Sequence, residues 1–170
     1  MSVDERMFRR TVGSFATGVC VVTSVIPDNG QPVGLTVNAF SSVSLDPPQI
    51  LVCLGNRSSS LEPIKSSGHF AVNILSSLQK DMSIRFANKS DDKWGGVEYS
   101  PGLGGVPLLA GCIAHLQCQV ANIIDSGDHA IVIGDVKLAD HHVSGAPLVY
   151  FRGAYFDNLM AHISAEDGGR

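Results

Sequence analysis

One stretch, residues 34–48, constrains the fold of this chain most. Small hydroxyl and amide residues alternate there with apolar ones, only roughly at period two, and no charge appears before Asp46. Such alternation is typical of a half-buried strand, and its lapse indicates a bend. The runs at 19–26 and 49–54 are largely apolar, as in strands buried on both faces. The stretch therefore predicts a polar strand, interrupted by a bend, between two buried strands.

The same stretch offers a row of neutral hydrogen-bonding side chains: Thr36, Asn38, Ser41, Ser42 and Ser44. A planar polar ligand such as a flavin suits this row, because the edge of its ring presents acceptors and one N–H donor. A Ser/Thr-rich edge strand in an ordinary barrel would contain the same residues. The stretch alone leaves both interpretations open.

The rest of the chain predicts many short strands. Pro27 to Gly30 reads as a turn, so the run after it should pair back on the first strand as a hairpin. Strands are expected at 19–26, 31–37, 49–54, 69–74, 112–124, 130–138 and 147–151. With few and short helices, this pattern predicts a mainly β fold, a β-barrel with peripheral helices.

Helices are expected before the first strand and after the strand at 69–74. Ser2 and Glu5 have the spacing of a capping box, so the first helix should begin there and end near Gly13. A third helix should follow Ser76-Ser77 and run to about Phe86 on an apolar stripe that includes Leu78 and Met82. Residues 88–107 are polar and rich in glycine, and they predict a long loop that serves as a lid or a subunit contact.

The serine-rich loop 55–60 leads into a short helix expected at about 61–66. Its hydroxyl and backbone N–H groups then lie where a helix N-terminus attracts anions, although the loop taken alone favours a plain serine N-cap. Arg85, Lys89 and Lys93 follow within nine positions and suit either a cationic rim for a phosphate or a solvated charged face.

Composition excludes several classes of protein. The net charge of −4 and the lack of a basic run argue against nucleic-acid binding, and no apolar run approaches the ~20 residues that cross a bilayer. The acidic N-terminus is unlike a signal peptide, so a cytoplasmic location is expected. Only 16% of the 170 residues are charged, which suggests that a second subunit covers part of the surface. A homodimer is therefore expected.

Neither the cysteines nor the histidines predict a metal site. Cys20, Cys53, Cys112 and Cys118 lack C-x-x-C spacing and read as reduced, buried thiols. The adjacent pair His141-His142 would point to opposite faces of a strand, so one ion would not take both. The glycines at 102–105 are no dinucleotide fingerprint either, because Pro107 follows where a helix should start.

Taken in order, seven segments of the chain resemble the flavin reductase family, which supplies reduced flavin to two-component monooxygenases and is built on the FMN-binding split barrel. The segments are 15–19, 34–44, 47–48, 70–75, 85–87, 127–129 and 151–155. The resemblance implies one split-barrel domain at 1–163, and the polar end at 164–170 is expected to be a flexible tail.

The resemblance also implies which residues bind the cofactor. They are Thr36, Val37, Asn38, Ala39, Ser41, Ser42, Leu54, Gly55, Ser58, Ser59, Ser60, Arg85, Phe86, Ala87, Lys89 and Tyr155. Residues 36–39 should line the ring edge, 41–42 the ribityl chain, and 54–60 the phosphate. Residues 85–89 should lie near the phosphate or the adenylate half of FAD. His129 in the Gly127-Asp128-His129 segment is implied as the catalytic residue on the nicotinamide side.

By this resemblance the chain is an NAD(P)H-dependent flavin reductase of the EC 1.5.1 type. FMN or FAD would accept a hydride from NADH or NADPH, and a separate oxygenase acting on an aromatic or similar small organic substrate would receive the reduced flavin. Two rivals share the barrel. One is a non-catalytic flavin- or haem-binding sensor or carrier, and the other is an oxidase of the pyridoxamine-phosphate type, which needs a more basic phosphate pocket.

Overall fold

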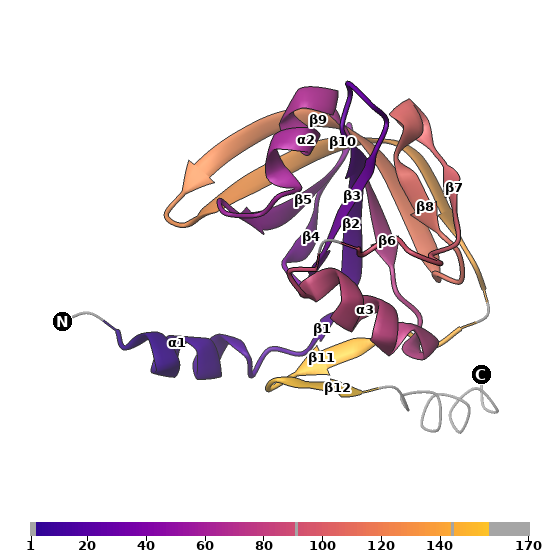
Figure 1. Ribbon diagram of the computed structural model, residues 1–170. Helices are drawn as coiled ribbons and strands as arrows, with labels where there is room; N and C mark the ends of the chain where they lie inside the picture. Colours follow the sequence, from indigo (N-terminus) through magenta and orange to yellow (C-terminus); the bar gives the residue numbers. More distant parts are fainter. Residues whose placement is uncertain (1–2, 91, 144, 157–170) are drawn as a thin grey trace.

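A seven-stranded antiparallel sheet forms the body of the molecule in a computed structural model that describes residues 3–90, 92–143 and 145–156 (Figure 1). The strands are ordered β3-β2-β6-β9-β10-β5-β4. Their bounds are β2 Cys20–Val25, β3 Pro32–Val37, β4 Phe40–Leu45, β5 Pro48–Gly55, β6 His69–Ile74, β9 Ala114–Ser126 and β10 His129–His141. The sheet curls strongly but β3 and β4 do not pair, so the barrel is split, as predicted.

The interior of the barrel explains why these residues form strands. β2 carries a run of apolar, largely β-branched side chains, and its first five residues are buried. Phe70 on β6 is fully buried and packs where Gly134 leaves room, since a Cβ on that glycine would lie 2.5 Å from the ring. Glycine is thus required at this crossing of two strands. A second apolar cluster lies outside the barrel, around Phe86, Leu109 and Leu148.

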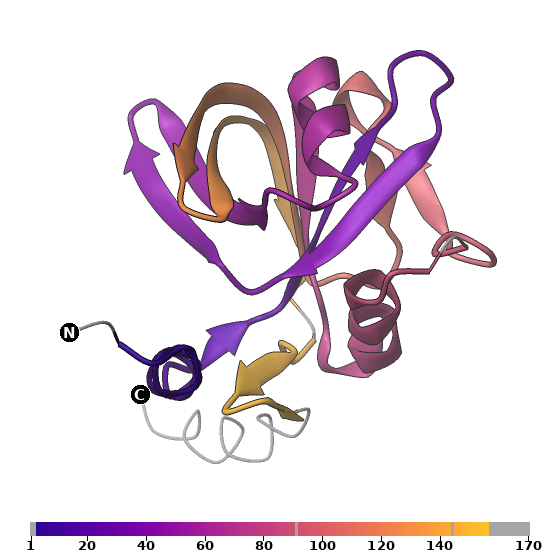
Figure 2. The same ribbon diagram turned by 60° about the vertical axis from the view of Figure 1, so that its left-hand side comes forward.

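Among the described residues, two smaller sheets and three α-helices surround the barrel. The small sheets are β1 Thr17–Gly18 with β11 Val149–Phe151 and β12 Ala154–Phe156, and β7 Tyr99–Pro101 with β8 Pro107–Leu109. The helices are α1 Glu5–Val12, α2 Leu61–Ser67 and α3 Lys80–Ala87, with 3-10 turns at Ser77–Gln79 and Leu103–Gly105. Figure 2 shows α3 and the β11–β12 hairpin at the same end of the barrel, and Figure 1 shows α1 extending to one side. None of the described helices is both long and apolar enough to cross a membrane.

The predicted hairpin and bend are confirmed. β2 and β3 pair antiparallel, with Cys20 opposite Val37, and the turn between them lies at 27–29. The polar stretch leaves the sheet at Asn38 and Ala39 and re-enters it as β4, which pairs with β5. The predicted helix after the serine-rich loop forms as α2, and all four cysteines are free thiols.

Three details of the sequence interpretation are wrong. Asp4, not Ser2, caps α1: its Oδ2 accepts a hydrogen bond from Met7 N at 3.1 Å, and Ser2 lies outside the described residues. Leu78 is 94% exposed because it belongs to a 3-10 turn before α3, where the apolar stripe does not continue. The short strands β1 and β12 were also missed.

The interpretation of 88–107 as a structureless loop is also wrong. This segment contains β7, a 3-10 turn and the start of β8. Its tryptophan, Trp94, packs edge-on against Phe86 at 4.9 Å and Tyr99 at 5.3 Å between ring centroids. Aromatic packing therefore replaces regular secondary structure in holding the loop to α3. The predicted tail at 164–170 and the domain end at 163 lie outside the described residues.

Candidate functional site

A small cleft lies between the end of β3, the end of α3 and the β11–β12 hairpin. Its volume is about 170 Å³, and it is lined by Val19, Thr36, Val37, Asn38, Ala87, Tyr150 and Tyr155. The bend at Asn38 opens it, because there the chain leaves one edge of the sheet before β4 begins. Five of these residues were predicted to bind the cofactor, and they come from three separate parts of the chain.

A chain of hydrogen bonds joins the three walls of this cleft. Thr36 Oγ1 donates to Ser83 O at 2.7 Å, and Ser83 Oγ lies 2.9 Å from the Tyr155 hydroxyl. Tyr155 in turn packs edge-on against Tyr150, with ring centroids 5.1 Å apart. The polar residues are therefore fixed in place, while Thr36 Oγ1 keeps acceptor capacity toward the cleft.

The predicted phosphate loop lies at the end of β5. Ser60 N donates to Ser58 Oγ at 3.2 Å, which holds the loop in a tight turn before α2. Ser60 is 1% exposed, makes no capping bond to the helix, and its Oγ has no partner among the described residues. Leaving a buried hydroxyl unsatisfied costs about 1–3 kcal/mol. The plain N-cap interpretation of this serine is thus not supported by the geometry, and the unused hydroxyl fits a loop that receives a polar ligand.

Thr17 is the other buried hydroxyl without a partner in the described part of the chain. It lies on β1 opposite Tyr150, one of the cleft residues. Together, the unused hydroxyls of Thr17 and Ser60 and the neutral polar residues at the bend fit a flavin, which brings many hydrogen-bonding groups of its own. Sequence reasoning missed Thr17, Val19 and Tyr150, although the first two lie inside a segment quoted for the family resemblance.

Two of the three predicted cations form hydrogen bonds within the protein, and the third is exposed. Arg85 Nη1 donates to Gly95 O at 2.8 Å, and Lys93 Nζ donates to Phe86 O at 3.2 Å, so both tie the 88–97 loop to α3. Burial lowers the pKa of Lys93. Lys89 is exposed just beyond the end of α3.

Two predicted contact residues have side chains that are closed off in the core. Phe86 is 1% exposed and lies beside Gly34, where a Cβ would come within 2.8 Å of its ring. Leu54 is fully buried inside the barrel. A ligand could therefore meet these two residues only through their backbone, and their side chains act by packing behind the cleft and the loop. Ser41 and Ser42 are exposed on β4.

His129 opens β10 and lies opposite Gly55 in the β5–β10 ladder. Its side chain is half exposed, and Nδ1 lies 2.7 Å from Asp128 Oδ1. The hydrogen bond and charge of His129 lower the pKa of the Asp128 carboxyl. Asn56 N donates to Asp128 O at 2.9 Å, so the histidine is joined to the serine-rich loop. The predicted residues therefore form two groups, one around the cleft and one around the end of β5.

A split barrel with a neutral polar cleft at one end defines the class of flavin-binding split-barrel proteins. Residues 12–158 match the model of the flavin reductase like domain. The chain belongs to this family.

Two curated relatives and two solved structures place the chain more closely. It is 40% identical over 155 residues, 90% of this chain and 82% of the relative, to the reductase subunit HsaB of a flavin-dependent monooxygenase from Mycobacterium tuberculosis. It is 43% identical over 156 residues, 90% of this chain and 81% of the relative, to a flavin reductase (NADH) from Kitasatospora aureofaciens.

The structure resembles the Streptomyces globisporus NADH:FAD oxidoreductase SgcE6, solved with NAD and FAD fragments, with a TM-score of 0.84 and 34% identity over 92% of this chain and 95% of that one. A solved structure from Sinorhizobium meliloti 1021 matches with a TM-score of 0.89 and 41% identity over 96% of this chain, which spans 57% of that longer protein.

Proposed function

We propose that the protein is an NAD(P)H-dependent flavin reductase that reduces FMN or FAD and supplies the reduced flavin to a separate monooxygenase. The observation that carries this proposal is the cleft whose walls are joined through Thr36, Ser83 and Tyr155. The names of the relatives, which are reductase subunits and flavin reductases, support it. We further infer that the protein acts as a homodimer in the cytoplasm.

In this proposal the bend of β3 holds the edge of the flavin ring. Thr36 and Asn38 offer side-chain oxygens and an amide, and Val37 and Ala39 contribute backbone groups. Ala87 lets the ring approach α3, because its small side chain leaves the cleft open. Tyr155 forms the far wall. Flavin supplies the redox chemistry when bound, since it accepts a hydride from the nicotinamide.

The phosphate side of the flavin would be held by neutral hydroxyls. Ser41 and Ser42 would meet the ribityl chain, and residues 55–60, with the unused hydroxyl of Ser60, would receive the phosphate. Arg57 in this loop and Lys89 beyond α3 are exposed cations that could approach the phosphate, whereas Arg85 is engaged with Gly95. A pocket with so little charge would hold flavin weakly, as a reductase that releases reduced flavin requires. It also disfavours the pyridoxamine-phosphate oxidase rival.

His129 would border the nicotinamide. Asp128 orients its ring, and the half-exposed position leaves Nε2 available to a second substrate. No charged acid–base pair is required, because hydride transfer depends mainly on stacking the two rings at the right distance. The choice between NADH and NADPH would be made around this open side.

Aerobic oxidation of NADH and of NADPH by the purified protein tests the proposal, with FMN, FAD or riboflavin added in excess. We expect a rate that saturates with added flavin, which would make flavin a substrate. If no flavin supports turnover although the protein binds one, the reductase assignment falls and the sensor or carrier takes its place. The same experiment ranks the flavins and the nucleotides.

A further inference from the structure

The hydroxyl of Ser83 on α3 forms a different kind of hydrogen bond from that of Ser66 on α2. Ser66 Oγ donates to Glu62 O at 2.7 Å, one turn earlier in the same helix, as serines within helices commonly do. The partner of Ser83 Oγ is instead the Tyr155 hydroxyl at 2.9 Å, and Ser83 Oγ has no other partner among the described residues. The hydrogen bond of Ser83 therefore reaches a residue 72 positions away.

The direction of this hydrogen bond follows from burial. A serine hydroxyl and a tyrosine hydroxyl each have one proton, so only one of the two donates to the other. Ser83 is 0% exposed, whereas Tyr155 is half-buried and lines the cleft. If Tyr155 were the donor, the Ser83 proton would be left without an acceptor inside the protein, which is costly. Ser83 is therefore the donor, and the Tyr155 oxygen is the acceptor.

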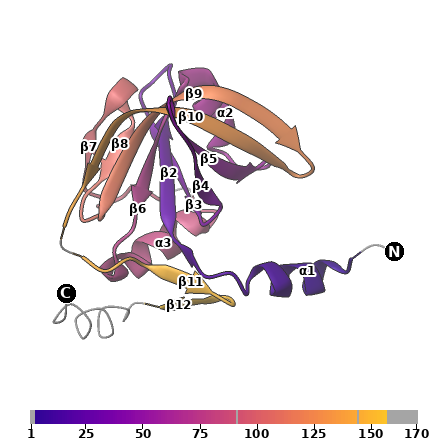
Figure 3. The same ribbon diagram turned by 180° about the vertical axis from the view of Figure 1, so that it is seen from behind.

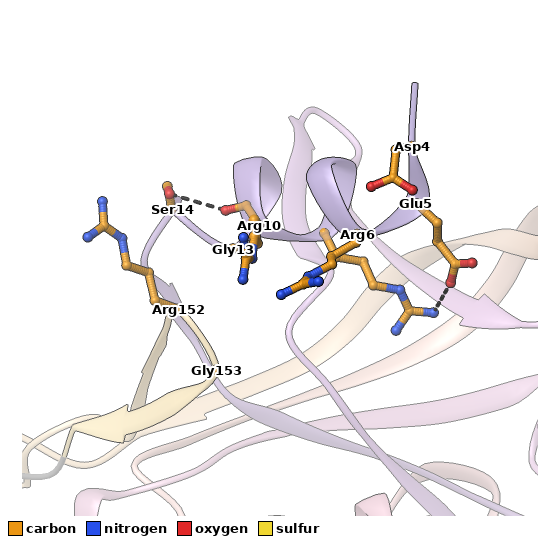
Figure 4. Close-up of a pocket in the computed structure, with 9 residues that line it drawn as sticks. Asp4, Glu5, Arg6, Arg10, Gly13, Ser14, Arg152 and Gly153 are labelled. Carbon is orange, nitrogen blue, oxygen red and sulfur yellow. Dashed lines mark hydrogen bonds and ion pairs between the residues drawn. The ribbon is translucent and has the colours of Figure 1, made fainter. Parts of the chain in front are cut away.

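The position of the Tyr155 ring is fixed, because the hairpin that carries it is held at several points. Tyr155 lies opposite Tyr150 in the β11–β12 ladder, and the two rings pack edge-on with centroids 5.1 Å apart. Figures 1 and 3 show the hairpin next to α3 from opposite sides. Arg152 N, in the turn of the hairpin, donates to Gly13 O at 2.8 Å, and Figure 4 shows this turn beside Gly13. The Tyr155 hydroxyl is thus held beside Ser83 by the fold.

Tyr155 and Thr36 offer the cleft hydrogen-bonding groups of opposite polarity. Because Tyr155 accepts from Ser83, its own proton has no partner among the described residues and can be donated at the cleft that the ring lines. Thr36 Oγ1 donates to Ser83 O at 2.7 Å, so it keeps only acceptor capacity. The edge of a flavin ring has the matching groups, since its acceptors stand beside one N–H donor. The cleft thus presents a donor and an acceptor to such a ring.

We propose that Ser83 is a positioning residue, which directs the Tyr155 hydroxyl to donate a hydrogen bond to an acceptor on the flavin ring. This inference rests on the flavin site of the proposed function and assigns a role to a residue that does not itself line the cleft. A donor fixed beside the ring stabilises the negative charge that the ring gains on reduction. The Tyr155 hydroxyl therefore favours reduced flavin over oxidised flavin.

Binding of FMN, in its oxidised form and anaerobically in its reduced form, tests the proposal by calorimetry. We expect Tyr155→Phe to raise the dissociation constant about threefold for oxidised FMN and about tenfold for reduced FMN, because a donor to a charged group is lost. Ser83→Ala should raise the constant for reduced FMN about threefold, but should change nothing in the Tyr155→Phe background, because Ser83 acts through Tyr155. Ser66→Ala is the matched control, an exposed helical serine that should bind FMN as wild type does.

A second measurement follows the hydroxyl itself. The chain has three tyrosines, so the NMR signal of isotopically labelled tyrosine Cζ is assigned to Tyr155 by its loss in Tyr155→Phe. We expect this signal to move when oxidised FMN binds to wild type and to move less in Ser83→Ala. Circular dichroism checks that each variant is folded.

Several outcomes would overturn the inference. They are a Tyr155→Phe variant that binds both forms of FMN as tightly as wild type, an effect of Ser83→Ala that persists in the Tyr155→Phe background, or a Cζ signal that FMN leaves unmoved. Unchanged FMN binding with a raised KM for NADH in Tyr155→Phe would instead assign the donor to the nicotinamide. A wild type that binds no FMN would overturn the inference together with the flavin site.

Turnover of NADH by wild type tests the reductase function separately, because none of the binding measurements requires NADH. If FMN binds and the variants behave as expected while no flavin supports turnover, the reductase function fails and the role of Ser83 stands. If turnover is normal and Tyr155→Phe binds both forms of FMN like wild type, only the role of Ser83 fails.

Discussion

Two polar clusters of similar composition lie on one face of the sheet, one on β2 and β6 and the other at the end of β3, and their hydrogen bonding differs. In the closed cluster, Asn73 Nδ2 donates to Val21 O and to Thr23 Oγ1, both at 3.0 Å, and Asn73 Oδ1 accepts from Leu109 N at 2.8 Å. Thr23 Oγ1 donates to Pro107 O at 2.6 Å. Both residues are fully buried.

The open cluster, around Thr36, contains the same kinds of residue but borders the cleft. The Thr36 hydroxyl donates its one hydrogen bond to Ser83 O and can still accept one, and Asn38 is exposed at the bend. A complete network specifies a fold, whereas an incomplete one at a cleft is ready for a ligand. The completeness of hydrogen bonding thus separates structural polar residues from functional ones in this chain.

The largest expected effect comes from breaking the closed cluster. Asn73→Leu would leave Leu109 N–H and Val21 C=O buried with one partner fewer, so we expect the free energy of unfolding to fall by about 3 kcal/mol. Urea denaturation measures this. The flavin KM of the enzyme that remains folded should not change, and a loss below about 1 kcal/mol would contradict the role assigned to the closed cluster.

A pair of identical substitutions sharpens the comparison. Thr23→Val should destabilise the fold by about 2 kcal/mol with little effect on the flavin KM, because its hydroxyl serves Pro107 and Asn73. Thr36→Val should cost less than about 1 kcal/mol, because its site is already half open, yet raise the flavin KM several-fold. Denaturation and steady-state kinetics on both variants provide the test. Equal behaviour of the two variants would remove the distinction between the clusters.

The buried thiols make the free energy of unfolding depend on pH. Burial raises the pKa of Cys20 and Cys118 to about 12 and that of Cys112 to about 11. The same thiols ionise near pH 9 when the chain is unfolded. Above that pH the unfolded chain is stabilised by ionisation while the folded thiols stay protonated, so the free energy of unfolding falls as the pH rises from 9 toward 11 and 12. Unfolding measured from pH 8 to 10 should show a loss of about 1 kcal/mol for each thiol. Cys118→Ala should have a shallower decline, and a slope identical to wild type would refute the assignment.

The smallest effect is expected at the exposed histidine. His129→Ala should raise the KM for NADH severalfold without removing flavin binding, because the side chain is half exposed and its hydrogen bond is to the exposed Asp128. Asp128→Asn, which keeps the shape but weakens the orientation of the ring, should lie between wild type and His129→Ala. Steady-state kinetics with NADH varied at saturating flavin separates the three, and an unchanged KM in His129→Ala would dismiss its role.

Much of the fold could be predicted from local pattern. The buried strands, the β2–β3 hairpin and the bend at 38–39 follow from periodicity and from turn residues, which act within a few positions of the chain. β12 was missed because its three residues form a strand only by pairing with β11. The prediction for Leu78 was wrong because this residue precedes Met82 by four positions, as on a helical stripe, although it belongs to a 3-10 turn.

The candidate site could be predicted only in part for a similar reason. Thr36, Val37 and Asn38 are marked by their own polar stretch, but Thr17 and Tyr150 become part of the site through contacts across the fold. Nor could the sequence distinguish Thr23 from Thr36, since both are threonines in strands. What separates them is whether the neighbouring strands complete their hydrogen bonds.

The most direct test of the account is flavin binding by wild type and by Ala87→Phe, measured by calorimetry. Ala87 lines a cleft of about 170 Å³, and a phenyl ring there would occupy the space assigned to the flavin ring. The account predicts a dissociation constant for FMN and FAD at least tenfold higher in Ala87→Phe, with an unchanged unfolding transition. Equal affinity in both proteins would contradict the assignment of this cleft as the flavin site.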